Sequence, residues 1–458
     1  MNFMKITNYN NISMYIILNA LFLFAFTQFL LINVYPTLMN EFNINSSQIQ
    51  LLTTLFLFTT LLLIPFSSFI SNQFQSNTLI NISLLFLIIG TIIGSQSYDF
   101  YLLLLSRILQ GIGYAIILPI SQTVILNISN NNNQAMYLGI LNSVVNIGPA
   151  IAPPITGIFI EYLEWRSLYY IMLPLEIILF ILSLVFLKNN FSKKSDYLNI
   201  KSSILYLILC TSIFLVLLFL NSHYIFTLTS FILCLFSVIT YIYFEKQQIH
   251  PLINLNFFKN KMTILSVSSI FITMMLLLSV ESILPILTQS VFKFTPSESG
   301  FIMTPGTIIL IIATTISGNL FDKYRSINII LIGIITLFLS LSLFLTVHIE
   351  TSLLYLIFLF CLFMFGMGFV ITPITTLAYN SFSRNKLNQA SALINTFRQL
   401  GLVLGVTVFA KSVSMISAFN FSSNDTYNLL IAVKGSFILM SLCTLILIYF
   451  TLEIKRSL

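Results

Sequence analysis

Four ionisable side chains fall inside long apolar runs of the sequence: Glu281, Glu176, Arg107 and Arg398. An ionisable residue within a membrane-spanning helix is costly and tends to be functional. Burial disfavours the charged form of a carboxyl group, so a buried carboxyl can hold a proton. Glu281 and Glu176 are therefore candidates for proton coupling, and Glu176 could also attract a cationic substrate. Arg107 keeps its charge and can bias the ionisation of a nearby carboxylate.

Each of these residues also has a structural interpretation. Glu281 could lie at the water boundary of its helix, and Glu176 could be a buried hydrogen-bond partner of a neighbouring helix. Arg398 could pair with an acid, bind a substrate anion, or donate to carbonyls at a kink. Leu362 occupies the place that corresponds to Arg107 in a second copy of the sequence pattern. This asymmetry favours a functional role for Arg107 over scaffolding.

The apolar runs around these residues indicate a polytopic membrane protein. Of the 458 residues, 57% are hydrophobic and 7% are charged, and the mean hydropathy is +0.98, which no soluble domain matches. The first run is too long for the apolar core of a cleavable signal peptide, so we expect a spanning helix there. Fourteen segments are predicted to span: 14–36, 48–70, 78–96, 101–127, 135–159, 167–187, 202–220, 224–243, 263–287, 298–319, 327–347, 352–379, 389–411 and 429–452.

The distribution of charge supports an even number of spans. With the N-terminus in the cytoplasm, 14 of the 20 basic residues fall in cytoplasmic segments, whereas the opposite side carries mainly acidic residues. This is the positive-inside pattern of membrane proteins. It predicts that both the N- and the C-terminus are cytoplasmic.

An internal repeat divides the predicted spans into two sets. Gly111-Ile112-Gly113 and, 21 residues later, Gln134-Ala135 correspond to Gly366-Met367-Gly368 and Gln389-Ala390. Repeats around a central site are a recurring design of transporters. We therefore expect an all-α membrane protein with two six-helix bundles, at 1–190 and 263–458. The segment 191–262 would add two inserted transmembrane helices with their flanking cytoplasmic loops.

The segment 146–157 concentrates three prolines and two glycines within one apolar run. Proline removes a backbone donor and bends a helix, which a membrane helix tolerates when its neighbours satisfy the freed groups. Gly148 and Gly157 leave a thin side for the approach of another backbone. With Pro149 and Pro153 they form a candidate hinge between two bundles that rock against each other. A kink needed only for packing is the alternative.

Four motifs resemble those of a known family. Arg107 to Gly113 matches R-x-x-Q-G-x-G, and Gly148 to Gly157, followed by Trp165-Arg166, resembles the export-associated G-P-x-x-G-P-x-x-G-G. The other two matches are Pro285, Gln289, Gly300 and Pro305, and Asn388 to Ala392 with Asn395, Arg398, Gln399, Gly401 and Gly405. On these residues the chain is similar to the major facilitator superfamily, and within it to the fourteen-span drug:H+ antiporter subfamily.

This resemblance implies proton-coupled export of amphipathic, often cationic drugs by alternating access. It places the predicted spans 135–159 and 389–411 at the moving seam, and it implies a cytoplasmic gate at Asp322, Lys323 and Arg325. Asn72 and Gln73 depart from the family, because they replace an aspartate and an arginine of the matching N-terminal gate. The candidates for the substrate cavity are Gln28, Asn33, Asn142, Asn146, Gln289 and Arg398.

Other classes of function fit less well. The sequence has no phosphate-binding G-x-x-x-x-G-K-[ST] and no metal-ligand spacing of histidines, so we expect no enzyme, metal or cofactor, with the proton gradient as the driving force. We expect a monomer in the cytoplasmic membrane whose partners are lipid, protons and small molecules, and not nucleic acid. Two alternatives stay open: an exporter of one endogenous metabolite or lipid, and a scaffold or sensor that has lost transport.

Overall fold

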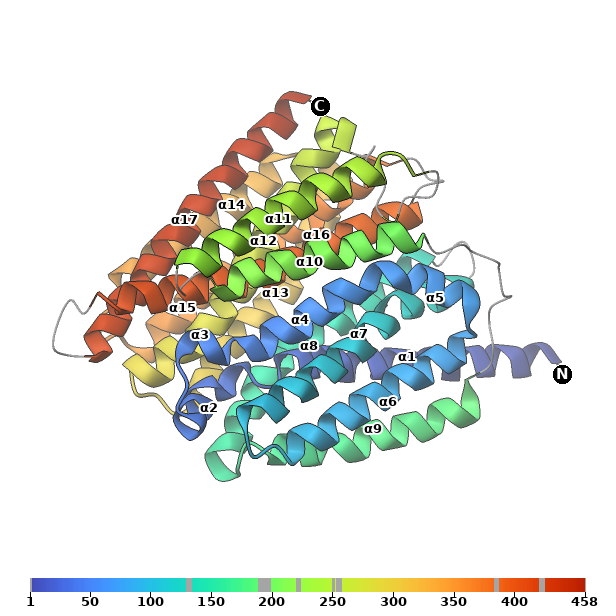
Figure 1. Ribbon diagram of the computed structural model, residues 1–458, viewed down its shortest axis with the longest axis horizontal. Coiled ribbons are helices and arrows are strands. Elements are labelled where there is room, and N and C mark those ends of the chain that lie inside the picture. Colours follow the sequence, from blue (N-terminus) through green and yellow to red (C-terminus); the bar gives the residue numbers. More distant parts are fainter. Residues whose placement is uncertain are drawn as a thin grey trace.

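The computed structural model is helical throughout the residues that it describes (Figure 1). These residues are 2–128, 134–187, 199–219, 224–248, 252, 258–382, 387–419 and 425–457. All regular elements within these ranges are helices, which agrees with the all-α prediction.

The N-terminal part contains six long helices joined by short turns. The long helices are α1 (Asn2–Phe29), α4 (Leu51–Leu63), α6 (Ser76–Ser95), α7 (Phe100–Ile128), α8 (Gln134–Tyr162) and α9 (Ser167–Phe186). The short elements are η1 (Ile32–Val34), α2 (Tyr35–Phe42), α3 (Ser46–Ile49), η2 (Ile64–Phe66) and α5 (Ser67–Gln73).

A hairpin of two helices, α10 (Ile200–Phe219) and α11 (Tyr224–Glu245), precedes the C-terminal part. The C-terminal helices are α12 (Lys261–Pro285), α13 (Pro296–Tyr324), α14 (Asn328–Leu343), α15 (Leu353–Asn380), α16 (Leu387–Ser417) and α17 (Asp425–Ser457). A π-helical turn, η4 (Ile286–Val291), follows α12, and a 3-10 turn, η5 (Phe344–Thr346), follows α14.

Within the described ranges, eleven helices are long and apolar enough to cross a membrane, and two shorter apolar helices cover Leu51–Phe66 and Ile200–Val216. Helix α9 shows how such helices are oriented. Tyr169, Glu176 and Ser183, spaced by seven residues, are buried on one face, whereas Ile178 and Ile181 are exposed. Polar groups inside and aliphatic groups outside suit a lipid environment. The count of fourteen spans and the cytoplasmic termini stay predictions.

The two parts of the chain repeat the same helix pairings. In the N-terminal part α7 packs against α4 and α6, α1 against α8, and α6 against α9. In the C-terminal part α15 packs against α13 and α14, α12 against α16, and α14 against α17. These are the pairings that the repeat in the sequence leads one to expect. The domain boundaries at residues 190 and 262 stay predictions.

Among the long helices, α8 packs against α13 and α4 against α16 across the two repeats, and shorter elements such as α3 add contacts to α16. Both segments expected at the seam, 135–159 and 389–411, therefore lie in helices that contact the other repeat. Their principal partners in the other repeat are α13 and α4.

Reciprocal glycines bring α8 and α13 into backbone contact. A Cβ atom at Gly157 would stand 2.6 Å from the carbonyl oxygen of Pro296, and one at Gly300 would stand 2.6 Å from that of Pro153. On another side of α8, a Cβ at Gly148 would stand 2.7 Å from the backbone nitrogen of Phe26 in α1. The sequence predicted one thin side for Gly148 and Gly157. In the structure the two glycines lie on different sides of α8, and each side is occupied by a neighbouring helix, one in each repeat.

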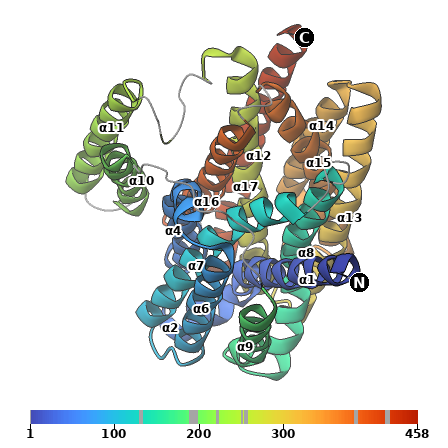
Figure 2. The same cartoon turned by 90° about the vertical axis from the view of Figure 1, so that its right-hand side faces the viewer.

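The hairpin of α10 and α11 lies beside α4 and α16, at one side of the bundle (Figure 2). Pro65 has no N–H, so the carbonyl of Leu61 loses the donor it would have in a continuous helix. The hydroxyl of Tyr206 in α10 donates to this carbonyl at 2.9 Å. Nearby, the rings of Phe58 and Phe214 stack with their centroids 4.3 Å apart. The inserted hairpin is therefore attached at the kink of α4.

The attachment of the hairpin predicts a stability effect. Tyr206→Phe removes the donor to a buried carbonyl, and we expect the free energy of unfolding in detergent to fall by about 1 kcal/mol. Tyr243→Phe is the matched control, because Tyr243 is 61% exposed. Equal unfolding curves for the two variants would contradict this role of Tyr206.

The glycine contact predicts that α8 and α13 separate when Gly300 gains a methyl group. In a background without native cysteines, we expect Gly300→Ala to accelerate maleimide labelling of a cysteine placed at the half-buried Ser297. Gly435→Ala is the control, because its Cβ would meet only the flexible end of Ile416. The contact does not hold the helices together if both variants label at the same rate.

Candidate functional site

Arg107 is fully buried in α7 and bonds to two other helices. Its guanidinium donates to the backbone carbonyls of Thr27 (2.9 Å), Gln28 (2.8 Å) and Leu52 (3.2 Å). It also donates to Oε1 of Gln110 at 2.9 Å. The ring of Phe56 lies 5.0 Å below the guanidinium carbon, within cation–π range. Arg107 therefore ties α7 to α1 and α4.

The break in α1 explains why these carbonyls are available. Helix α1 ends at Phe29, a 3-10 turn follows, and Pro36 lies at the start of α2. The last four carbonyls of a helix lack partners within it and carry partial negative charge. Thr27 and Gln28 supply two of these carbonyls. A buried cation at this helix end is favourable because it donates to these carbonyls and because it balances their partial negative charge.

The amide of Gln110 extends the contacts of Arg107 to Glu176. Nε2 of Gln110 donates to the hydroxyl of Thr91 in α6 at 3.3 Å, and this hydroxyl donates to Oε1 of Glu176 in α9 at 2.9 Å. The four side chains that these hydrogen bonds connect, Arg107, Gln110, Thr91 and Glu176, are 0% exposed. Glu176 thus has a hydrogen-bond partner on a neighbouring helix, and it is also linked to the motif arginine.

Glu281 has a different environment in α12. It is 3% exposed, and its Oε2 has no hydrogen-bond partner within the described residues. Pro285, four residues later, ends α12 and leads into the π-helical turn η4. The structure therefore buries this carboxyl group next to an irregular segment and does not place it at the surface.

Asn33 and Gln289, two candidates for the substrate cavity, meet at the contact between the repeats. Asn33 lies in η1 and is 0% exposed. Its amide donates to the carbonyls of Pro153 (3.2 Å) and Pro296 (2.8 Å). Gln289 in η4 donates to the backbone oxygen (2.9 Å) and Oδ1 (3.1 Å) of Asn33. We call these four residues the Asn33 seal, because they join η1 and α8 to η4 and α13.

Arg398 is half-buried in α16, the helix that packs against α12 in its own repeat and against α4 in the N-terminal repeat. Gln28 is buried and contributes its backbone carbonyl to Arg107. The side chains of Asn142, Asn146 and Pro149 lie outside the described residues.

The residues of the predicted cytoplasmic gate lie at the exposed end of α13. Asp322, Lys323 and Arg325 are exposed, and none takes part in an ion pair among the described side chains. Arg325 adopts a left-handed conformation (φ 46°) and caps α13 with a 2.8 Å bond from its N–H to the carbonyl of Phe321. The structure gives Arg325 a helix-capping geometry, and the gating role of the three residues stays a prediction.

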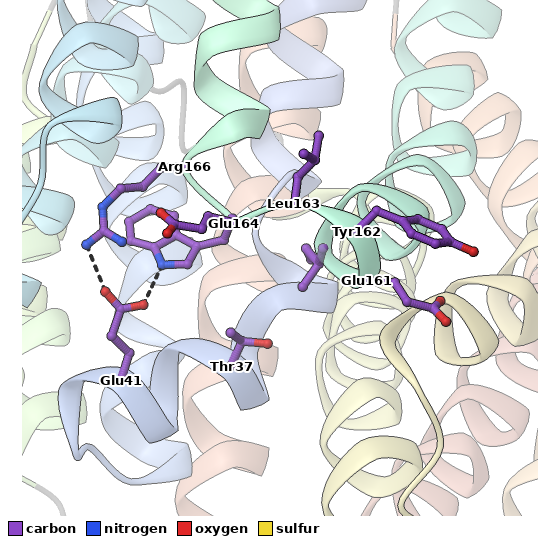
Figure 3. Close-up of a pocket in the computed structure, with 9 residues that line it drawn as sticks. Thr37, Glu41, Glu161, Tyr162, Leu163, Glu164 and Arg166 are labelled. Carbon is purple, nitrogen blue, oxygen red and sulfur yellow. Dashed lines mark hydrogen bonds and ion pairs between the residues drawn. The ribbon is translucent and has the colours of Figure 1, made fainter.

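A polar cluster at the start of α9 joins Trp165 and Arg166, which follow the export-associated motif, to Glu41 (Figure 3). Glu41 accepts from the indole of Trp165 at 2.6 Å and from Arg166 at 2.8 Å. Arg166 also donates to the carbonyl of Ser97 at 2.9 Å. The cluster borders an open pocket of about 570 Å³. It fixes the start of α9, the helix that carries Glu176. The sequence motif contains Trp165 and Arg166 but does not identify Glu41 as their partner.

Comparison with known proteins agrees with this architecture. Lincomycin resistance protein LmrB of Bacillus subtilis (strain 168) is 29% identical over 390 residues, which cover 83% of this chain and 80% of LmrB. Riboflavin transporter RibZ of Clostridioides difficile (strain 630) is 25% identical over 433 residues, which cover 92% of each chain.

The fold also matches solved structures. A bacterial homologue of the human lysosomal transporter Spinster, in an inward-facing and occupied conformation, superposes with a TM-score of 0.73 at 13% identity, over 98% of this chain and 97% of that one. At this identity the likeness concerns the fold alone. The family model described as Major Facilitator Superfamily matches residues 17–406. The chain therefore belongs to the Major Facilitator Superfamily, as a multi-pass transporter of the cell membrane.

Proposed function

We propose that the protein exports amphipathic, often cationic compounds in exchange for protons, as a fourteen-span drug:H+ antiporter. The observation that carries this proposal is the pair of buried carboxyl groups, Glu176 and Glu281, within the helices of the two repeats. Neither forms an ion pair among the described side chains. A charged group at the centre of a membrane helix costs roughly 3 kcal/mol on insertion scales. Proton uptake removes that charge.

The exchange follows from competition for this charge. An ionised carboxyl attracts a cationic substrate, and a protonated one does not. Protonation therefore favours release of the cation, and it also lowers the cost of moving the carboxyl through an apolar environment. The Asn33 seal would open and re-form as the two repeats rock. The proton gradient then supplies the driving force, and no cofactor is required.

The names of the relatives support export without fixing the substrate. LmrB is named for resistance to lincomycin, which is consistent with efflux of an amphipathic compound. RibZ is named for riboflavin, which is a single metabolite. Both kinds of substrate occur among proteins similar to this chain.

Arg398 favours a second candidate, the transport of one metabolite that carries an acidic or carbonyl group. A half-buried guanidinium on a helix that contacts both repeats can donate to such a group and stack on an aromatic ring. This candidate uses the same fold and the same alternation between states. It differs in the substrate, so a transport assay with ethidium and with riboflavin distinguishes the two.

Proton-coupled transport can be measured in proteoliposomes. We expect an imposed pH gradient to drive ethidium against the direction of proton flow. Glu176→Gln combined with Glu281→Gln should lower this rate at least tenfold, because neither amide can exchange a proton. Glu350→Gln is the control, since Glu350 is exposed. Transport of riboflavin with no transport of ethidium would favour the second candidate.

Either of two results would overturn the proposal. In the first, an imposed pH gradient drives neither compound. In the second, the double glutamine variant retains the gradient dependence of the wild type. Binding of either compound without transport would instead favour a scaffold or sensor.

A further inference from the structure

The hydrogen bonds between Arg107 and Glu176 all run in one direction. Arg107 donates to Gln110, Gln110 to Thr91, and Thr91 to Glu176. The guanidinium at one end is a pure donor and an ionised carboxylate at the other is a pure acceptor. The amide and the hydroxyl between them each donate once and accept once along the chain. This is the arrangement that links two opposite charges through neutral groups.

The backbone of α6 leaves room for this series of hydrogen bonds. A Cβ atom at Gly90 would stand 2.7 Å from Cγ of Gln110, and one at Gly94 would stand 2.6 Å from Cε1 of Tyr169. Two glycines therefore flank Thr91 and let side chains of α7 and α9 lie directly against α6. Any larger residue at Gly90 would displace Gln110 from Thr91.

Few other charges can act on Glu176. Its Oε2 has no partner among the described residues, and Tyr169, on the same helix, interacts with it electrostatically. Helix α6, which packs against α9, has no ionisable residue. The ionisable residues of the other helices packed against α9 lie in the first half of α1 or near the ends of α8: Lys5, Tyr9, Tyr15, Tyr137, Glu161 and Tyr162.

We propose that Glu176 senses Arg107 through Thr91 and Gln110, which act as positioning residues for the proton step. This inference rests on the proposed function only in taking Glu176 as a proton site. Ionised Glu176 polarises the whole chain, because hydrogen bonds in series strengthen one another in a medium of low dielectric constant. Protonated Glu176 carries no charge and does not polarise these hydrogen bonds. Glu281 has no such connection in the described structure, so Glu176 is the carboxyl whose charge reaches Arg107.

Beyond Arg107, the series of hydrogen bonds that starts at Glu176 ends at the broken end of α1. The remaining bonds of Arg107 go to the carbonyls of Thr27, Gln28 and Leu52. A change at Gln110 alters how the guanidinium divides its donors between the amide and these carbonyls. Asn33, at the centre of the Asn33 seal, follows Gln28 by five residues. Proton uptake at Glu176 thereby acts on the segment that closes the contact between the repeats.

The experiment follows the carboxyl stretching band of Glu176 in the infrared spectrum of the purified full-length protein as pH is varied. Glu176→Gln assigns the band by removing it. We expect Thr91→Val to shift the midpoint of the band upward by about one pH unit, because the carboxylate loses a charge-assisted hydrogen bond. Thr91→Ser should restore the wild-type midpoint. Thr273→Val is the control, because its buried hydroxyl donates within its own helix, to the carbonyl of Ser269.

A double-mutant cycle tests the route. Gln110→Met should shift the midpoint upward in the wild-type background and should add nothing in the Thr91→Val background. The proposal is overturned if Thr91→Val titrates like Thr273→Val, or if the effect of Gln110→Met is fully additive. The titration does not depend on transport. Failure of the transport assay would refute the proposed function, and the titration would still decide whether Glu176 is coupled to Arg107.

Discussion

The arrangement of the N-terminal repeat depends on one buried cation, Arg107, that bonds to backbone carbonyls and to an amide. A charge removed from water is tolerated only when its donors are satisfied. Its partners come from α1 and α4, so α7 cannot shift relative to those helices without leaving donors unpaired. The carbonyls of Thr27 and Gln28 can accept from Arg107 because α1 stops at Phe29 and resumes as α2 around Pro36. The break in α1 and the buried charge therefore stabilise each other.

The same break connects two functions that an alternating-access transporter must couple. On one side of it, Arg107 leads through Gln110 and Thr91 to the carboxyl of Glu176. On the other side, the 3-10 turn presents Asn33 to the carbonyls of Pro153 and Pro296. The helices α8 and α13 approach at the same place through Gly157 and Gly300. The proposed proton site and the contact between the repeats thus share one short, irregular segment of backbone.

The sequence predicted the membrane class, the repeat and the residues at the centre of this arrangement, because apolar runs, glycine and proline patterns and isolated charges are local signals. It could not predict which residues meet. Asn33 and Gln289 were separate cavity candidates, and their bond spans 256 positions of the chain. Thr91 carries no signal, since a threonine in an apolar helix usually bonds its own backbone. The pairing of Glu41 with Trp165 and Arg166 is equally remote in sequence.

The central claim is that buried carboxyl groups exchange protons for substrate. The most direct test is to add ethidium to the purified protein in weakly buffered detergent solution and to record the pH with an indicator dye. The account predicts that the wild type releases protons on binding and that the variant carrying Glu176→Gln and Glu281→Gln binds ethidium without release. Equal proton release by the wild type and the double variant would contradict it.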